Sequence, residues 1–185
     1  MSFLNQLDPE DRNLVVSLPY RVGLMVSQSD ETGGDEADEM EQRALSSILN
    51  GYAQEVFGSE TVQYIISETI SKQSKWTEWA GELNNVEQDC HKAVDLLSDL
   101  VDQKEVNAFK QHLMEIGESV AMAFREQHDL GMFARFKLFL DYKKDRKLAE
   151  QKKMAVKSWD QFLNISMHER RALRMIAGAL NMTYI

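Results

Sequence analysis

The stretch Glu41-Gln-Arg43-Ala44-Leu45-Ser-Ser-Ile48-Leu-Asn-Gly-Tyr52 is echoed near the other end of the chain by Glu169-Arg-Arg171-Ala172-Leu173-Arg-Met-Ile176-Ala-Gly-Ala-Leu180. Glu, Arg, Ala, Leu and Ile coincide in one register, and Tyr52 corresponds to Leu180 as a bulky apolar residue. The apolar members are three and four residues apart, the spacing of one buried helical face. We therefore predict an all-α fold with two related halves. Chance agreement among helix-favouring residues is the alternative explanation of the match.

The composition fits one soluble globular domain covering residues 1–185. Its 185 residues are 43% hydrophobic, and its two prolines, Pro9 and Pro19, lie near the start, which favours long helices. The net charge of −9 argues against non-specific binding of nucleic acid. Cys90 is the only cysteine, so no disulfide framework is expected. The sequence shows neither a signal peptide nor a membrane span, so a cytoplasmic location is expected.

Apolar periodicity predicts a compact bundle of about seven helices. Asp8 and Pro9 resemble a helix start, Ser59 resembles another, and Asp102 to Glu105 resembles a capping box. Residues 76–101 read as a continuous seam nearly four heptads long. A charged helical insertion is expected at about 137–160, before a last helix that begins after Ser166.

The segment between Ser29 and Glu41 carries seven carboxylates and no basic residue. A bound hard cation would relieve the repulsion among so many like charges. An EF-hand is excluded because Asp35 stands at the loop position that requires glycine. A different oxygen-ligand site for Ca²⁺ or Mg²⁺ remains open. Its candidate ligands are Asp30, Asp35, Asp38 and Glu41. The alternative is that these acids cap the following helix, whose N-terminus favours negative charge.

These residues resemble the tellurite-resistance TerB-like family. The resemblance rests on residues 26–34, on Glu41-x-x-x-Leu45-x-x-Ile48, and on the last helix from Glu169 to Met182, where the family often has glycine at position 181. It implies a compact seven-helix domain of two related halves whose acidic residues bind a divalent metal. It further implies a role in stress responses or membrane-linked complexes, without a known reaction.

Other clusters are better explained by structure than by chemistry. Glu126, His128 and Asp129 are expected to terminate a helix, and the nine basic residues between 135 and 157 to form a solvated helix. No phosphate loop or nucleophile motif is present, so an enzyme is not expected. The sequence thus predicts a non-catalytic, metal-binding adaptor. The alternative is a metal-independent interaction module or homodimer that uses the basic helix or the 76–101 seam to bind a protein partner.

Overall fold

The computed structural model describes residues 3–29, 35–54, 58–123, 143, 146, 147 and 167–184, and the side chains of 35–41 and 167 lie outside that description. Every regular element in this part is helical, which confirms the predicted all-α bundle of about seven helices. The α-helices are α1 (Pro9–Ser27), α2 (Asp35–Gln54), α3 (Glu60–Ser71), α4 (Trp76–Ala80), α5 (Val86–Ser98), α6 (Gln103–Ala123) and α9 (Met167–Ala179). Short 3-10 turns η1 (Phe3–Gln6), η2 (Gln73–Lys75) and η3 (Leu83–Asn85) connect some of them.

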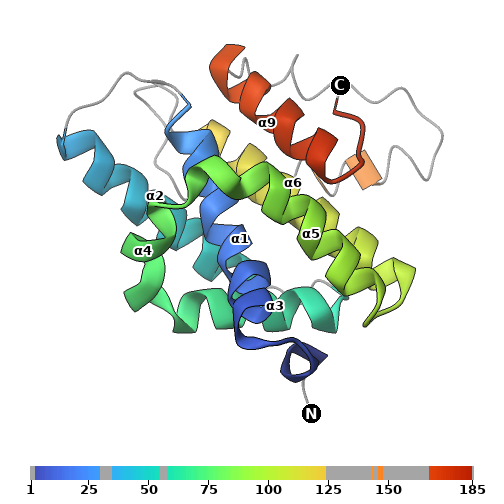
Figure 1. Cartoon of the computed structure of the whole chain (residues 1–185). Helices are drawn as coiled ribbons and strands as arrows, with labels where there is room; N and C mark the ends of the chain where they lie inside the picture. Colours follow the sequence, from blue (N-terminus) through green and yellow to red (C-terminus); the bar gives the residue numbers. More distant parts are fainter. Residues whose placement is uncertain are drawn as a thin grey trace.

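Helix α1 runs through the middle of the bundle (Figure 1), in contact with α2, α3, α4, α5, α6 and α9. It starts as predicted, with Asp8 accepting hydrogen bonds from the backbone N–H groups of Glu10 and Asp11, and it continues without interruption through Pro19. From Val15 to Leu24 every residue of α1 is buried. A helix that is surrounded on all sides has no polar face to present, which explains its weak amphipathic pattern.

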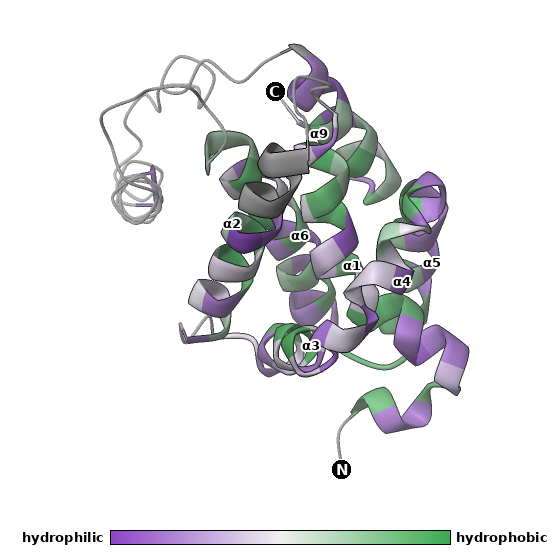
Figure 2. Cartoon of the chain, turned by 90° about the vertical axis from the view of Figure 1, so that its left-hand side faces the viewer, coloured by the Kyte–Doolittle hydropathy of each residue, from purple (hydrophilic) through white to green (hydrophobic). Residues whose placement is uncertain are grey.

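The two repeated stretches occupy equivalent environments in α2 and α9. Both arginines are exposed, whereas the apolar residues that correspond in the two stretches are all at most 4% exposed. These residues are Ala44, Leu45, Ile48 and Tyr52 in α2, and Ala172, Leu173, Ile176 and Leu180 in α9. Both helices turn hydrophobic residues toward α1 and α6 (Figure 2). The predicted buried face is therefore confirmed in both.

Each repeated leucine packs against a glycine of a central helix. A Cβ atom on Gly23 of α1 would lie 2.4 Å from Leu45 Cδ1, and one on Gly117 of α6 would lie 2.9 Å from Leu173 Cδ2. Distances this short leave no room for even a methyl group. The two glycines therefore let α2 approach α1, and α9 approach α6, through the same kind of contact.

Helices α1 and α6 share the spacing between a capping aspartate and a closely packed glycine, a relation that the repeated stretches do not reveal. Asp8 caps α1 fifteen positions before Gly23, and Asp102 accepts a hydrogen bond from Glu105 N–H fifteen positions before Gly117. The outer helices are paired in the same way. Helices α2 and α9 each pack against both α1 and α6, and so do α3 and α5. The bundle thus has two related sides around the α1–α6 pair.

The continuous seam predicted over residues 76–101 is wrong. The chain leaves α4 at Gly81, passes through η3 and begins α5 at Val86. Trp76 stacks on Tyr20 with ring centroids 4.5 Å apart, and Trp79 Nε1 donates a hydrogen bond to Asn13 Oδ1 at 3.3 Å. These contacts with α1 turn α4 out of line with α5. The apolar spacing reflects burial against one core rather than one long helix.

The predicted capping box at Asp102 is half correct. Asp102 caps α6, but the Glu105 carboxylate accepts hydrogen bonds from Ser59 Oγ at 2.7 Å and from Thr61 N at 3.0 Å. Burial raises the pKa of Glu105, yet these hydrogen bonds more than offset it and hold that pKa below its ordinary value. Glu105 therefore ties the start of α6 to the start of α3.

Helix α9 ends at a residue with a positive φ. Asn181 has φ of 51°, in the left-handed region, and Met182 N–H donates to the Ala177 carbonyl at 2.8 Å. This is a Schellman-type end, in which glycine or asparagine is favoured.

Candidate functional site

The predicted metal ligands lie at the start of α2, where the description of the chain is partial. Asp30 lies outside the described residues, and so do the side chains of Asp35, Asp38 and Glu41. The backbone of α2 begins at Asp35, as predicted. Positions 35, 38 and 41 are therefore three residues apart on a continuous helix, which places their Cα atoms on one side of its first two turns. Among the described side chains, no group of three metal-ligating residues gathers.

Glu169, which corresponds to Glu41 in the repeat, has a described side chain. It lies in the first turn of α9 and is 6% exposed. A carboxylate this buried must be hydrogen-bonded or paired. In the second half, the repeated glutamate is thus a component of the packed structure rather than a solvated cap.

A cluster of buried polar side chains lies between α2 and α6, and the sequence analysis did not identify it. Its centre is the Glu115 carboxylate, which contacts the Lys143 ammonium and accepts a hydrogen bond from Gln111 Nε2 at 2.9 Å. His112 Nε2 lies 3.8 Å from Glu115 Oε2. Ser119 Oγ donates to the Glu115 backbone carbonyl at 2.7 Å and lies 3.0 Å from the Tyr52 hydroxyl.

The low polarity of this region changes the protonation of its bases. Burial lowers the pKa of His112 to about 4, while the contact with the Ala108 carbonyl raises it and the charge of Lys143 lowers it further. Burial, together with the positive charges of Arg146 and Lys147, lowers the pKa of Lys143 to about 7, and the Glu115 carboxylate that Lys143 contacts favours its charged form. The cluster therefore holds a neutral imidazole beside the contact between Lys143 and Glu115. Its contacts bind α2 and residue 143 to α6.

Arg21 is the corresponding buried charge on α1, two residues before Gly23 as Glu115 is two residues before Gly117. It is 1% exposed, and its guanidinium lies 2.7 Å from Asp89 Oδ2 of α5 and donates to the Glu82 carbonyl at 2.5 Å. These contacts fasten α5 and η3 to the central helix. No spacing rule singles out Arg21, because its partners are more than sixty residues away.

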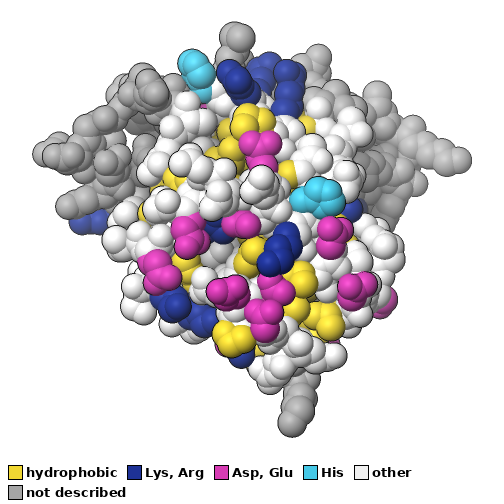
Figure 3. Space-filling model, in the orientation of Figure 1, with side chains coloured by type: hydrophobic (Ala, Val, Ile, Leu, Met, Phe, Trp, Pro, Cys, Tyr) yellow, Lys and Arg dark blue, Asp and Glu magenta, His cyan; other side chains and the backbone are white. Residues whose placement is uncertain are grey.

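A hollow of about 460 Å³ lies between the start of α1 and the end of α3. Its lining consists of Asn5, Leu7, Pro9, Arg12, Asn13, Lys72 and Lys75. Three of these seven residues are cationic, although the chain as a whole is acidic. Elsewhere on the face in Figure 3, acidic side chains are interspersed with hydrophobic and a few basic ones. The sequence analysis missed this cationic set because its members come from segments sixty residues apart.

The remaining predictions have mixed outcomes. Cys90, Trp76 and Trp79 are core residues, at 0%, 7% and 0% exposed. Glu126, His128 and Asp129 lie outside the described residues, as does the basic stretch 135–157 except Lys143, Arg146 and Lys147, which are helical. No described helix has both the length and the apolar character needed to cross a membrane.

Comparison of the chain with protein-family models, with curated proteins and with solved structures gives no match. Functional inference therefore depends on the residues themselves.

Proposed function

We propose that this protein is a non-catalytic, TerB-like helical domain that binds a divalent cation through Asp30, Asp35, Asp38 and Glu41. In this proposal Ca²⁺ or Mg²⁺ connects the acidic segment to α2, and the domain acts as a metal-responsive adaptor in a stress response. Both ions prefer carboxylate oxygens, and Ca²⁺ accepts six to eight of them in flexible arrangements.

The observation that carries the proposal is the position of the acidic segment relative to α2. Helix α2 begins at Asp35, and its later turns are fixed in the core by Leu45, Ile48 and Tyr52. A helix anchored in this way gives Asp35, Asp38 and Glu41 a rigid backbone at regular spacing, and Asp30 precedes it by only five residues. Rigid support for the ligands reduces the entropy lost when a cation binds.

Titration calorimetry with CaCl₂ and MgCl₂ tests the proposal. We expect one saturable site with affinity on the order of micromolar, together with a raised thermal midpoint. Asp30→Asn and Glu41→Gln should each abolish the heat of binding. Glu10→Gln is the control, since Glu10 is an exposed acid in the first turn of a different helix, α1.

Folded protein that gives neither heat nor a thermal shift would contradict the proposal, and the acids would then serve as helix caps. The rival function, a metal-independent interaction module, would instead give self-association or partner binding that is insensitive to Asp30→Asn. The 76–101 seam is a poor surface for it, because Trp79, Cys90 and Leu97 are each 0% exposed in the single chain.

A further inference from the structure

We propose that the hollow between α1 and α3 is a second binding site, which takes the phosphate group of a small organic molecule. This site is separate from the acidic segment and does not depend on the cation-binding proposal.

The cationic side chains of the hollow outnumber the acids near them. Arg12, Lys72 and Lys75 face a single carboxylate, Glu68, whose Oε2 lies 2.9 Å from Arg12 Nη2 and 3.7 Å from Lys72 Nζ. Glu68 can neutralise only one of the three positive charges, and no ion pair engages Lys75 within the described residues. Among the lining residues and Glu68, positive charges thus outnumber negative ones by two, on a protein whose net charge is −9.

Two acids at the start of α1 are already engaged. Asp8 accepts two backbone hydrogen bonds at the start of α1, and Asp11 pairs with Lys92 at 2.5 Å. Neither carboxylate lines the hollow. An incoming anion would thus meet the cations of the hollow without a free carboxylate among its lining residues.

Two side-chain oxygens of the lining already accept hydrogen bonds, whereas one nitrogen of the lining has no hydrogen-bond partner among the described residues. Asn5 Oδ1 accepts from Arg12 Nη1 at 3.1 Å, and Asn13 Oδ1 accepts from Trp79 Nε1 at 3.3 Å. Arg12 Nε is buried without a hydrogen-bond partner in the described part of the chain. The charged ends of Arg12, Lys72 and Lys75, rather than this buried atom, are the donors that an anion in the hollow could contact.

Phosphate fits these donors better than other anions do. It offers three terminal oxygens and close to two negative charges, matching one guanidinium and two ammonium groups. The hollow is larger than an inorganic phosphate ion needs, and its volume falls in the range typical of small-molecule sites. Leu7 and Pro9 provide apolar surface for the organic part of the ligand.

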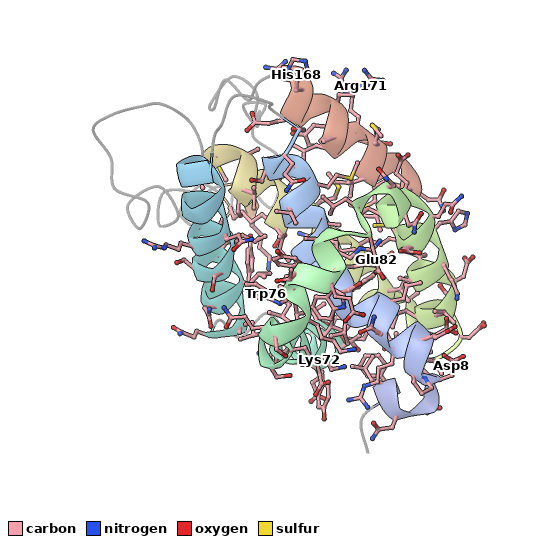
Figure 4. All side chains as sticks on the ribbon, turned by 60° about the vertical axis from the view of Figure 1, so that its left-hand side comes forward. Asp8, Lys72, Trp76, Glu82, His168 and Arg171 are labelled. Atoms are coloured by element: carbon pink, nitrogen blue, oxygen red, sulfur yellow. The ribbon has the colours of Figure 1, made fainter. Side chains whose placement is uncertain are left out.

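The lining is fixed by local structure rather than carried on a loose loop. Lys72 follows the last residue of α3, and Lys75 N–H donates to the Lys72 carbonyl at 2.8 Å, so both lysines belong to the tight turn that leads into α4. Lys72 and Trp76 lie on this connection in Figure 4, with Asp8 at the start of α1 on the neighbouring chain segment. Trp76 is stacked in the core, which anchors the turn. Little ordering is then required when an anion binds.

The test is a titration of ¹⁵N-labelled protein with pyrophosphate and with glycerol 3-phosphate, at constant ionic strength, followed by amide chemical shifts. We expect saturable shifts at Asn5, Asn13, Lys72 and Lys75, and none with glycerol. Lys75→Gln and Lys72→Gln should each weaken binding about 10- to 100-fold, the range for a lost charge-assisted hydrogen bond. Lys104→Gln is the matched control, because Lys104 is an exposed lysine of α6 outside the lining.

A phosphate group can also belong to a lipid headgroup, so a second arm uses vesicles of phosphatidic acid, with phosphatidylcholine vesicles as the neutral control. Saturable binding of glycerol 3-phosphate alone assigns a soluble ligand. Co-sedimentation with phosphatidic acid that Lys75→Gln abolishes assigns a lipid phosphate. The proposal is overturned if neither probe binds, if shifts arise elsewhere, or if Lys104→Gln weakens binding as much as Lys75→Gln.

Discussion

Replacement of Gly23 by alanine should destabilise the protein because of one contact between α1 and α2. The new Cβ would lie 2.4 Å from Leu45 Cδ1 and 3.4 Å from both Leu45 Cδ2 and Ile116 Cγ2. Overpacking of this kind costs about 1–3 kcal/mol. Alanine recovers about 0.5–1 kcal/mol because it restricts the unfolded chain more than glycine does. We expect a net loss of about 1–2 kcal/mol in the free energy of unfolding.

The same substitution at two other glycines provides a graded series. At Gly117 the Cβ would lie 2.9 Å from Leu173 Cδ2, so Gly117→Ala should cost less than Gly23→Ala. At Gly178, an exposed residue of α9, nothing lies within 4 Å. Gly178→Ala should therefore raise the stability by about 0.5–1 kcal/mol.

Urea unfolding followed by circular dichroism measures these differences, and a double-mutant cycle tests their cause. Leu45→Val removes both Cδ atoms and should by itself cost about 1 kcal/mol. In that background Gly23→Ala should become neutral or stabilising, because the atoms that it would meet are mostly gone. If Gly23→Ala has the same effect with and without Leu45→Val, the proposed contact between α1 and α2 is not the cause.

Three further predictions concern buried titratable groups. His112 takes up a proton near pH 6.5 in the unfolded state but only near pH 4 in the folded state. The free energy of unfolding should therefore fall by at most about 3 kcal/mol as the pH drops through that range. His112→Gln should remove this part of the pH dependence in urea titrations. Asp89→Ala leaves Arg21 buried without its carboxylate and should lower the free energy of unfolding by about 2–3 kcal/mol. Asp95→Ala, at an exposed ion pair, should change it by less than about 0.5 kcal/mol. Equal effects of the two substitutions would contradict the importance of burial. Burial raises the pKa of Cys90 to about 12. A thiol reagent at pH 8 should therefore label the folded protein at least about a thousandfold more slowly than the urea-unfolded protein. Rapid labelling of the folded protein would be inconsistent with that burial.

The sequence by itself determined the class of the fold and much of its helical detail. Buried stripes with three- and four-residue spacing lie where the pattern predicted them in α2, α3, α6 and α9, because amphipathic periodicity directly reflects which face of a helix is buried. Asp8, Ser59 and Asp102 cap helices as predicted. Capping is readable because its partners lie within three residues along the chain.

The tertiary structure alone decided what depends on distant partners. The 76–101 seam splits at Gly81, and the direction that α4 then takes is set by the packing of Trp76 and Trp79 against α1. Glu105 caps α3 because the fold brings residues 59–61 within its reach. The Glu115 cluster, the Arg21–Asp89 pair and the cationic hollow likewise join side chains from different helices. Helical periodicity records which face of a helix is buried, whereas electrostatic and hydrogen-bonding partners are determined by how the helices pack.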